Sequence, residues 1–339
     1  MKKRVLITGG CGFIGTNSSL AFDDEGFHVL AVDNFSRPTG RHNAQELESR
    51  GSIEIQEFDI SNKDNIDRIL KSFQPNVVLH LAAQVAVTTS LENPYLDFNS
   101  NIVASFNLLE SMRTHSNARL IFSSTNKVYG NLEELPIKVE ASRYWYAKEE
   151  FKGVSEQQVF DPHSPYGCSK GAVDKYITDY NRSYGLDSVV LRQSCIYGKR
   201  QYGIEDQGWI AWFMISALRN RAVTIYGDGK QVRDALYVED LCDLYLKLTT
   251  QEKMSKRVFN VGGGVDNSIS VLELLIWIQS NFAPELSWDY SEERLGDQKI
   301  FVSDNTSLEN ELGWKPKTPL SLGLTSVWSW LEKRIKDEI

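Results

Sequence analysis

Residues 4–15 read Arg4-Val5-Leu6-Ile7-Thr8-Gly9-Gly10-Cys11-Gly12-Phe13-Ile14-Gly15, and this stretch decides the fold. A short apolar run, typical of a buried strand, is followed at once by glycines that satisfy the pattern G-x-G-x-x-G. Glycines permit a tight turn and close approach to a pyrophosphate, while the free N–H groups of the following helix attract negative charge. The stretch therefore predicts a dinucleotide site, although a merely tight turn would also use glycines. The expected cofactor contacts are Gly9, Gly12, Phe13, Ile14 and Gly15.

A second predicted strand, residues 28–33, ends on Asp33, close to the expected distance of about 20 residues beyond the glycines. A carboxylate there accepts hydrogen bonds from a ribose 2′-hydroxyl and repels a 2′-phosphate. NAD is therefore favoured over NADP, although Arg37 lies nearby. Asn34 is expected to contact the cofactor together with Asp33. Asp59 and Ile60, after the third strand, are expected to contact the adenine. An aspartate that only closes a turn would look the same.

Short β-branched runs alternate with amphipathic stretches through the first part of the chain. This alternation predicts βαβ crossovers and a parallel sheet with helices on both faces. From about residue 195 the pattern changes to longer loops, aromatic residues and glycine turns. We predict a Rossmann-type doubly wound α/β fold, with an NAD-binding domain at residues 1–190 that carries the catalytic residues. A smaller C-terminal α/β substrate domain is expected at 191–339, with interleaved segments, and residues 131–162 are predicted to be a lid-like insertion.

Composition excludes several classes of function. The chain has 339 residues, with 45 acidic and 37 basic side chains and a formal net charge of −8. Such a charge does not attract nucleic acid or an anionic membrane surface, and no segment reaches the ~20 apolar residues of a membrane span. The four cysteines and five histidines lack the spacing of metal ligands, so we expect no metal. A reducing, cytoplasmic location is predicted.

Tyr166 and Lys170 are the first candidates for catalysis. They lie four residues apart at the start of a predicted helix, so both side chains occupy one face. An ammonium beside a phenol favours the phenolate, which can then act as a base near neutral pH. Thr125, at the end of a predicted strand, supplies a hydroxyl that would orient the reacting oxygen toward Tyr166. A solvent-facing pair on a helix has the same spacing, so this interpretation depends on the glycine motif.

Together these motifs resemble the extended short-chain dehydrogenase/reductase family of nucleotide-sugar epimerases and dehydratases. Besides the glycine stretch and the Thr125, Tyr166 and Lys170 set, the resemblance rests on residues 80–83, 101–110, 197–201, 227–234 and 312–316. It implies NAD as cofactor, a nucleotide-diphosphate sugar as substrate and a homodimer or higher homo-oligomer. The cofactor contacts that it adds are Tyr166, Lys170, Leu81, Ala82, Ala83 and Asn101.

Two positions narrow the activity within the family. Dehydratases carry an Asp-Glu pair directly after the catalytic threonine, and here Asn126 and Lys127 stand there, which argues against elimination of water. Cys195 occupies a position where UDP-galactose 4-epimerases usually have asparagine. The resemblance is strongest to a subgroup of sugar 2-epimerases, through residues 123–130, 163–172 and 206–209. It implies transient oxidation to a keto-sugar, turnover of that intermediate and re-reduction. A UDP-sugar 4-epimerase and a catalytically dead NAD-sensing or structural protein remain alternatives.

A diphosphate bound to an acidic chain must be neutralised locally. Arg200, Arg233 and Arg294 lie in predicted loops of the C-terminal part, and a guanidinium fork suits phosphate. A surface salt bridge is the alternative for each of them, and it explains Arg233, the first choice for the phosphates, less well than the other two. The resemblance adds Gln84 and Gln207 as contacts to the sugar or base. The predicted substrate set is Gln84, Thr125, Asn126, Arg200, Gln207, Arg233 and Arg294.

Overall fold

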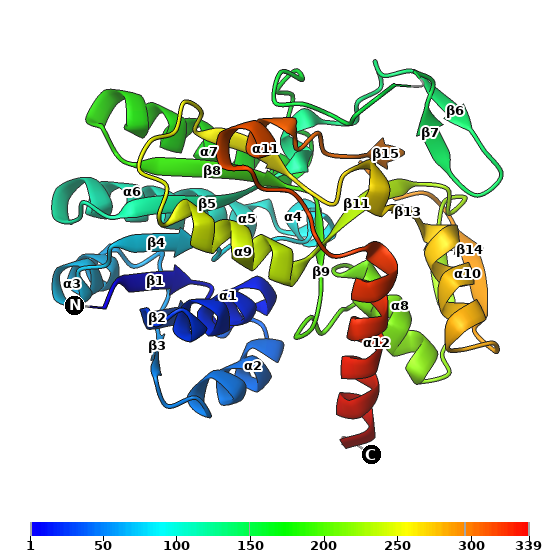
Figure 1. Cartoon of the computed structure of the whole chain (residues 1–339), viewed down its shortest axis with the longest axis horizontal. Helices are drawn as coiled ribbons and strands as arrows, with labels where there is room; N and C mark the ends of the chain where they lie inside the picture. Colours follow the sequence, from blue (N-terminus) through cyan, green and yellow to red (C-terminus); the bar gives the residue numbers. More distant parts are fainter. Residues whose placement is uncertain (1, 149, 295, 338–339) are drawn as a thin grey trace.

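The protein, described as a computed structural model over residues 2–148, 150–294 and 296–337, is built around a seven-stranded sheet (Figure 1). All of its strand pairs are parallel, and the strand order is β12-β8-β5-β4-β1-β2-β3. Its strands are β1 (Arg4–Thr8), β2 (His28–Asp33), β3 (Ile53–Glu57), β4 (Val77–His80), β5 (Arg119–Thr125), β8 (Ser188–Gln193) and β12 (Val258–Val261). The order reverses between β1 and β4, which is where doubly wound sheets bind their ligands. The predicted fold class is therefore confirmed.

Helices cover both faces of this sheet (Figure 1). On one face lie α1 (Phe13–Asp24), α2 (Thr39–Glu48) and α9 (Val238–Leu248), and on the other α3 (Lys63–Phe73), α6 (Ala104–His115) and α7 (Ser164–Tyr184). Successive strand residues alternate between the two apolar cores, so Val5 and Ile7 pack in the first and Leu6 in the second. Burial on both faces explains why the strands read as short continuous apolar runs.

Helix α7 places the catalytic candidates at the ligand-binding edge. Pro165 stands in its first turn, where the missing N–H removes no helical hydrogen bond. The helix ends at Gly185, whose φ of 69° gives the left-handed conformation that closes many helices. Tyr166 and Lys170 consequently occupy its first two turns, next to the carboxyl end of β5.

The C-terminal part has a separate apolar core. It contains β9 (Cys195–Tyr197), β10 (Val223–Tyr226), β11 (Val232–Tyr237), β13 (Ser268–Ser270), β14 (Trp288–Ser291), β15 (Ile300–Phe301), α8 (Trp209–Leu218), α10 (Val271–Asn281) and α12 (Leu320–Asp337). Strand β12 and helix α9 return to the seven-stranded sheet, so the chain passes between the two parts more than once. The predicted boundary at residue 190 falls within β8, and the division into two domains stays a prediction. None of the described helices is long and apolar enough to cross a membrane.

The remaining elements are short. They are α4 (Val87–Glu92), α5 (Pro94–Phe98), η1 (Asn99–Val103), η2 (Asn126–Tyr129), β6 (Ile137–Val139), β7 (Tyr144–Tyr146), η3 (Val265–Asn267) and α11 (Thr306–Leu312). The insertion that was predicted to be lid-like forms the β6–β7 hairpin and packs on the C-terminal part. The Tyr144 N–H donates to the Lys230 carbonyl at 2.8 Å, and Tyr146 is buried among Val232, Ile300 and Val302. The aromatic residues of the segment therefore anchor it to the C-terminal part, so it is not a free loop.

Candidate functional site

The glycine turn after β1 leaves no room for side chains. A Cβ on Gly9, whose φ is 68°, would lie 2.8 Å from the Ala82 nitrogen, and one on Gly15 would lie 2.0 Å from the Gly9 carbonyl oxygen. Gly12 is the N-cap of α1, and no side chain caps that helix. The first amides of α1 are thus left for a ligand, as an anion-binding helix start requires.

Asp33 lies at the edge of this turn. Its carboxylate accepts hydrogen bonds from the N–H groups of Cys11 at 3.1 Å and Phe35 at 2.9 Å. Burial raises the pKa of Asp33, and these hydrogen bonds oppose the rise. The Asn34 amide donates to Asp59 at 2.7 Å, which brings the predicted adenosine contacts together at the ends of β2 and β3.

The loop after β4 lies against the same turn. The N–H of Leu81 donates to the Thr8 carbonyl at 3.1 Å, and that of Ala82 to the Thr8 hydroxyl at 3.3 Å. His80 lies 2.7 Å from the same hydroxyl through Nδ1 and 2.8 Å from the Ser105 hydroxyl through Nε2. Burial lowers the pKa of His80 to about 3, with Lys170 contributing, so the ring is neutral and holds the loop in place.

The three predicted catalytic residues come together at the end of β5. The Thr125 hydroxyl lies close enough to the Tyr166 phenol to lower the pKa of that phenol. Lys170 is 4% exposed, and its Nζ lies 4.2 Å from the centre of the Phe122 ring. Burial lowers the pKa of Lys170 to about 7, although Asp97 and Asp174 oppose this. The site therefore holds a buried ammonium beside a phenol and a hydroxyl.

One electrostatic expectation is not met in this arrangement. Burial raises the pKa of Tyr166, and the groups that lower it are Thr125 and Arg37, not Lys170. Desolvation of the phenol itself is the largest cause, and the nearby Asp97 carboxylate adds to it. The phenol thus requires a further positive charge nearby to ionise easily.

Asn101 and Gln84 shape the wall of the site. Asn101 Nδ2 donates to the Gln84 carbonyl at 3.0 Å, to Asp97 at 3.0 Å and to the Ser169 hydroxyl at 2.9 Å. The Gln84 side chain donates to the Ala86 carbonyl at 2.8 Å and to Asp97 at 3.1 Å. Both amides, predicted as cofactor and substrate contacts, are thereby used to tie the β4 loop to α7.

A buried ion pair behind the catalytic residues was missed by sequence reasoning. Asp174 accepts hydrogen bonds from Arg192 at 2.8 and 3.1 Å and from the Ser124 hydroxyl at 2.9 Å. Asp174 follows Lys170 by one helical turn and Ser124 precedes Thr125, so the Asp174 carboxylate ties α7 to β5 through Ser124 and to β8 through Arg192. The only available signal was the helical spacing of Asp174 from Lys170, since Arg192 lies on another strand.

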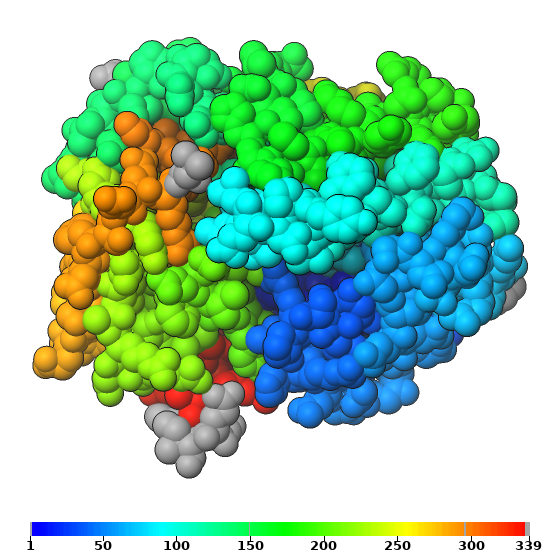
Figure 2. All heavy atoms as spheres, turned by 180° about the vertical axis from the view of Figure 1, so that it is seen from behind, coloured from blue at the N-terminus to red at the C-terminus, as the bar shows by residue number. Residues whose placement is uncertain are grey.

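A cavity of about 290 Å³ adjoins these residues, between the two parts of the chain. In Figure 2 the blue and cyan nucleotide-binding segments meet the yellow-green segment around α8 on the face toward the viewer. Of the predicted substrate residues, Gln207, Arg233 and Arg294 line the cavity. Arg233 donates to Asp297 at 2.5 Å, and Arg294 lies 3.9 Å over the Tyr226 ring. Both arginines border this one space, and each also forms an ion pair there, Arg233 with Asp297 and Arg294 with Asp206 at 3.3 Å.

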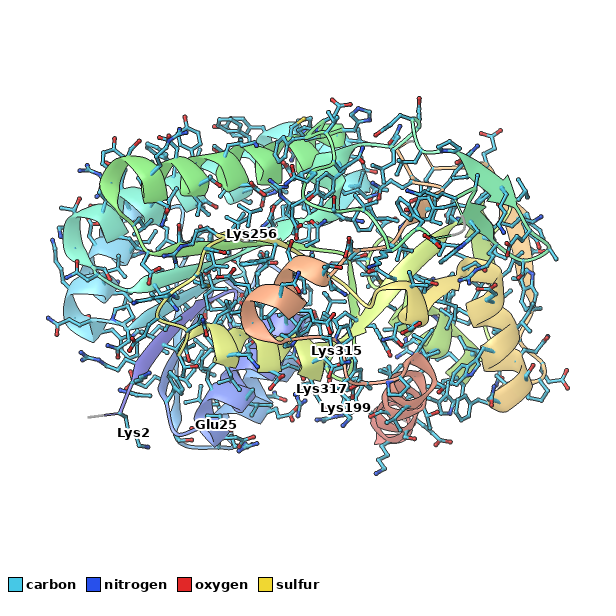
Figure 3. The ribbon with its side chains drawn as sticks, turned by 45° about the horizontal axis from the view of Figure 1, so that its top comes forward. Lys2, Glu25, Lys199, Lys256, Lys315 and Lys317 are labelled. Carbon is cyan, nitrogen blue, oxygen red and sulfur yellow. The ribbon has the colours of Figure 1, made fainter. Side chains whose placement is uncertain are left out.

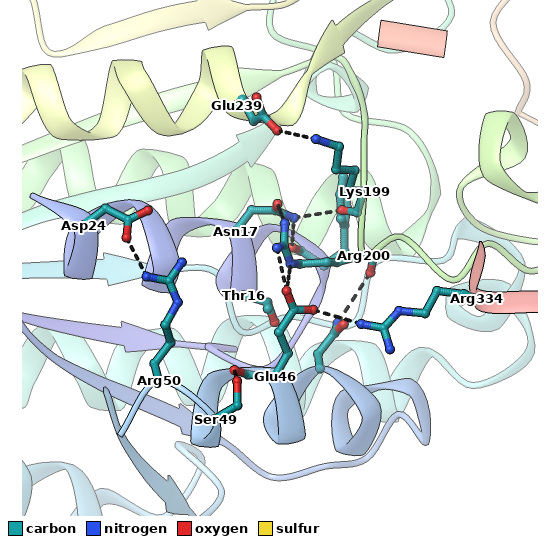
Figure 4. Close-up of polar contacts among 12 residues, drawn as sticks. Thr16, Asn17, Asp24, Glu46, Ser49, Arg50, Lys199, Arg200, Glu239 and Arg334 are labelled. Carbon is teal, nitrogen blue, oxygen red and sulfur yellow. Dashed lines mark hydrogen bonds and ion pairs between the residues drawn. The ribbon is translucent and has the colours of Figure 1, made fainter. Parts of the chain in front are cut away.

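Arg200 lies outside this cavity lining. Its guanidinium donates to Glu46 at 2.6 and 3.0 Å and to Asn17 at 2.9 Å (Figure 4). Arg334 approaches the same carboxylate at 3.5 Å. Arg200 therefore joins the loop after β9 to α1 and α2, which corresponds to the salt-bridge alternative, and its guanidinium is not presented to a phosphate.

Asn126 is buried beside the predicted catalytic threonine. Its amide donates to Gln298 at 3.3 Å, and its oxygen accepts from the Thr125 hydroxyl at 3.4 Å. The described residues include no group of three or more His, Cys, Asp or Glu side chains that could hold a metal ion.

Known proteins share this architecture. The family model described as GDP-mannose 4,6 dehydratase matches residues 6–327. The CDP-paratose 2-epimerase of Salmonella typhi is 40% identical over 334 residues, covering 96% of this chain and 98% of that protein. A putative UDP-glucose 4-epimerase of Methanocaldococcus jannaschii is 32% identical, covering 97% and 98%.

Solved structures with a similar fold include two epimerases. The UDP-glucose 4-epimerase of Thermotoga maritima with UDP-glucose has a TM-score of 0.84 and 31% identity, covering 98% of this chain and 99% of that one. The UDP-glucuronic acid 4-epimerase of Bacillus cereus, in complex with UDP-glucuronic acid and NAD, has a TM-score of 0.83 and 26% identity with the same coverage.

Proposed function

This chain belongs to the extended short-chain dehydrogenase/reductase family whose model is described as GDP-mannose 4,6 dehydratase, and on that premise we propose that it is an NAD-dependent CDP-paratose 2-epimerase. The observation that carries the proposal is the meeting of Thr125, Tyr166 and the buried Lys170 beside a cavity lined by two arginines. The 40% identity to a CDP-paratose 2-epimerase over nearly the whole length supports the choice of substrate.

The crevice fits NAD. The glycine turn has no space for a Cβ and leaves the first amides of α1 for a pyrophosphate. The Asp33 carboxylate keeps lone pairs for a ribose hydroxyl after accepting its two backbone bonds, and its charge disfavours a 2′-phosphate. When bound, NAD would accept a hydride from the sugar carbon and return it.

The side chains supply the proton chemistry. Tyr166 takes the proton of the sugar hydroxyl as the carbon is oxidised, and Thr125 holds that oxygen in line with the phenol. The keto-sugar would turn within the cavity before the bound cofactor reduced its opposite face, and Tyr166 would return the proton to the oxygen. Lys170, one helical turn after Tyr166, would hold the ribose of the bound cofactor with its ammonium. No proton, hydride or oxidant is consumed overall.

Asn126 and Lys127 distinguish this reaction from dehydration. Elimination of water needs an acid and a base next to the catalytic hydroxyl. Here the Asn126 amide is bonded to Gln298, and Lys127 lines the cavity with an ammonium. The described residues place no carboxylate at either position, so the keto-sugar is preserved for re-reduction.

The test is turnover of the two candidate substrates. Purified protein should convert CDP-paratose to CDP-tyvelose, seen by NMR as inversion at carbon 2, and should leave UDP-glucose unchanged. Inversion of UDP-glucose at carbon 4 with no action on CDP-paratose would favour the 4-epimerase alternative. No turnover of either, in protein shown to contain NAD, would favour the catalytically dead alternative.

We also propose that the protein is a cytoplasmic homodimer that supplies an activated sugar for lipopolysaccharide O-antigen. An apolar face runs along α5, α6 and α7, where Tyr95, Phe106, Tyr176 and Tyr184 are 76%, 41%, 48% and 58% exposed. In Figure 2 the cyan and green segments that contain these helices lie side by side on the face toward the viewer. Such a patch is typical of an interface. Light scattering should give twice the chain mass, and Phe106→Asp should reduce it.

A further inference from the structure

Lys127 lies within the catalytic site but has no part in the chemistry described above. Its N–H donates to the Thr125 hydroxyl at 3.2 Å. Its carbonyl oxygen would be 3.1 Å from a Cβ on Gly167, the residue that follows Tyr166. The Lys127 main chain is therefore held between the two residues that handle the reacting oxygen, and its side chain lines the cavity.

The Lys127 ammonium lacks a partner among the described residues: no hydrogen bond or ion pair joins its Nζ to them. The nearby Asp297 is engaged by Arg233 at 2.5 Å. Burial, followed by the charge of Arg233, lowers the pKa of Lys127 to about 8, and Asp297 opposes this. An ammonium has three donors and no acceptor, so this group can donate to the oxygen atoms of a ligand in the cavity.

The position of the ligand follows from the two ends of the site. The reacting carbon must lie at Thr125 and Tyr166, whereas the cavity arginines, Arg233 and Arg294, are suited to the diphosphate. Lys127 borders the first of these places and is electrostatically coupled to Arg233 at the second. In the proposed substrate the reacting carbon 2 is bonded to carbon 1, which carries the diphosphate, so the sugar ring lies where these two places meet, next to Lys127.

On the basis of the proposed epimerase function, we propose that Lys127 binds the non-reacting ring oxygens of the sugar and holds the keto-sugar in the cavity while it turns. The residue is thus a specificity determinant for the sugar, distinct from the arginines that hold the phosphates. It neither takes nor gives the proton of the reacting hydroxyl. Its loss should let the keto-sugar escape and leave the cofactor reduced.

The test compares Lys127→Met with wild type and with Lys315→Met, an exposed lysine labelled in Figure 3. Turnover of CDP-paratose, binding of CDP alone by calorimetry and the ultraviolet absorbance of reduced cofactor are measured. Lys127→Met should lower kcat/KM by about 10- to 100-fold, the size expected for loss of a charged hydrogen bond. It should bind CDP as the wild type does and accumulate reduced cofactor, while Lys315→Met should match the wild type.

Two results would contradict the role proposed for Lys127. Wild-type kcat/KM in Lys127→Met would remove any role in sugar binding, and a CDP affinity weakened as much as kcat/KM would make Lys127 a phosphate anchor. Absence of turnover in the wild-type protein would overturn the proposed function instead. Binding of CDP in calorimetry also shows that the variant is folded. We expect Lys127→Met to fold, because the change removes an unpaired, partly buried charge.

Discussion

Lys170→Met should stabilise the cofactor-free protein while removing its activity. The Lys170 ammonium is 4% exposed, and no carboxylate forms an ion pair with it in the described part of the chain. Burial lowers its pKa from 10.5 to about 7. At about 1.4 kcal/mol for each tenfold change, keeping this proton in the folded state costs about 4 kcal/mol at pH 7.

The cost depends on pH in a definite direction. Below pH 10.5 the unfolded chain binds the Lys170 proton, whereas the folded chain binds it only below about pH 7. In that window the unfolded state binds more protons, so the free energy of unfolding rises with pH. The penalty falls from about 4 kcal/mol at pH 7 to about 1 kcal/mol at pH 10. Methionine has a similar volume and no charge, so the variant lacks this slope.

Urea unfolding of NAD-free wild type, Lys170→Met and the exposed control Lys315→Met at several pH values measures the effect. Lys170→Met should exceed wild type by about 1 to 4 kcal/mol at pH 7, and the difference should shrink toward pH 10. Its turnover should fall at least about a hundredfold. A variant less stable than wild type at pH 7, or a difference independent of pH, would refute the view that Lys170 is an uncompensated buried charge.

Three further changes separate catalysis, binding and folding. Tyr166→Phe should lower kcat, measured by NMR, at least about a hundredfold while NAD binding stays intact. The control Tyr184→Phe, at the exposed end of the same helix, should keep the wild-type kcat. Arg233→Ala should weaken CDP binding, measured by calorimetry, by about tenfold. Arg200→Ala should leave CDP binding unchanged and lower the free energy of unfolding by about 1 kcal/mol. Asp174→Asn should lower the free energy of unfolding by about 3 to 5 kcal/mol, because it leaves a buried guanidinium unpaired; a loss under 1 kcal/mol in urea unfolding would contradict this.

The sequence predicts well what depends on neighbouring residues. The glycine turn, the strand that ends on Asp33 and the helix that carries Tyr166 and Lys170 all follow from local spacing, and the structure has them in those places. Because parallel strands end at one edge of a sheet, the motifs at their ends also had to meet. The doubly wound fold and the catalytic trio could therefore be predicted together.

Pairing between distant residues could not be predicted in this way. Arg200 and Glu46 are 154 positions apart, and a loop arginine shows no local sign of which anion it will meet. The same holds for Arg192, whose partner Asp174 lies on a helix, and for the aromatic residues of the insertion, which could pack or form a lid. In each case the outcome depends on tertiary packing that periodicity does not encode.

The unpaired lysines explain how a chain of net charge −8 can bind two anionic ligands. Arg200, outside the cavity, is neutralised by Glu46, whereas Lys127 and Lys170 have no ion-pair partner in the described residues. Two buried or half-buried positive charges thus lie where the cofactor and the sugar nucleotide are expected. Desolvating these two ammonium groups has already lowered the stability of the protein, so a ligand that supplies oxygen atoms does not have to desolvate them again. Attraction is therefore local and preorganised, and the acidic surface has no part in it.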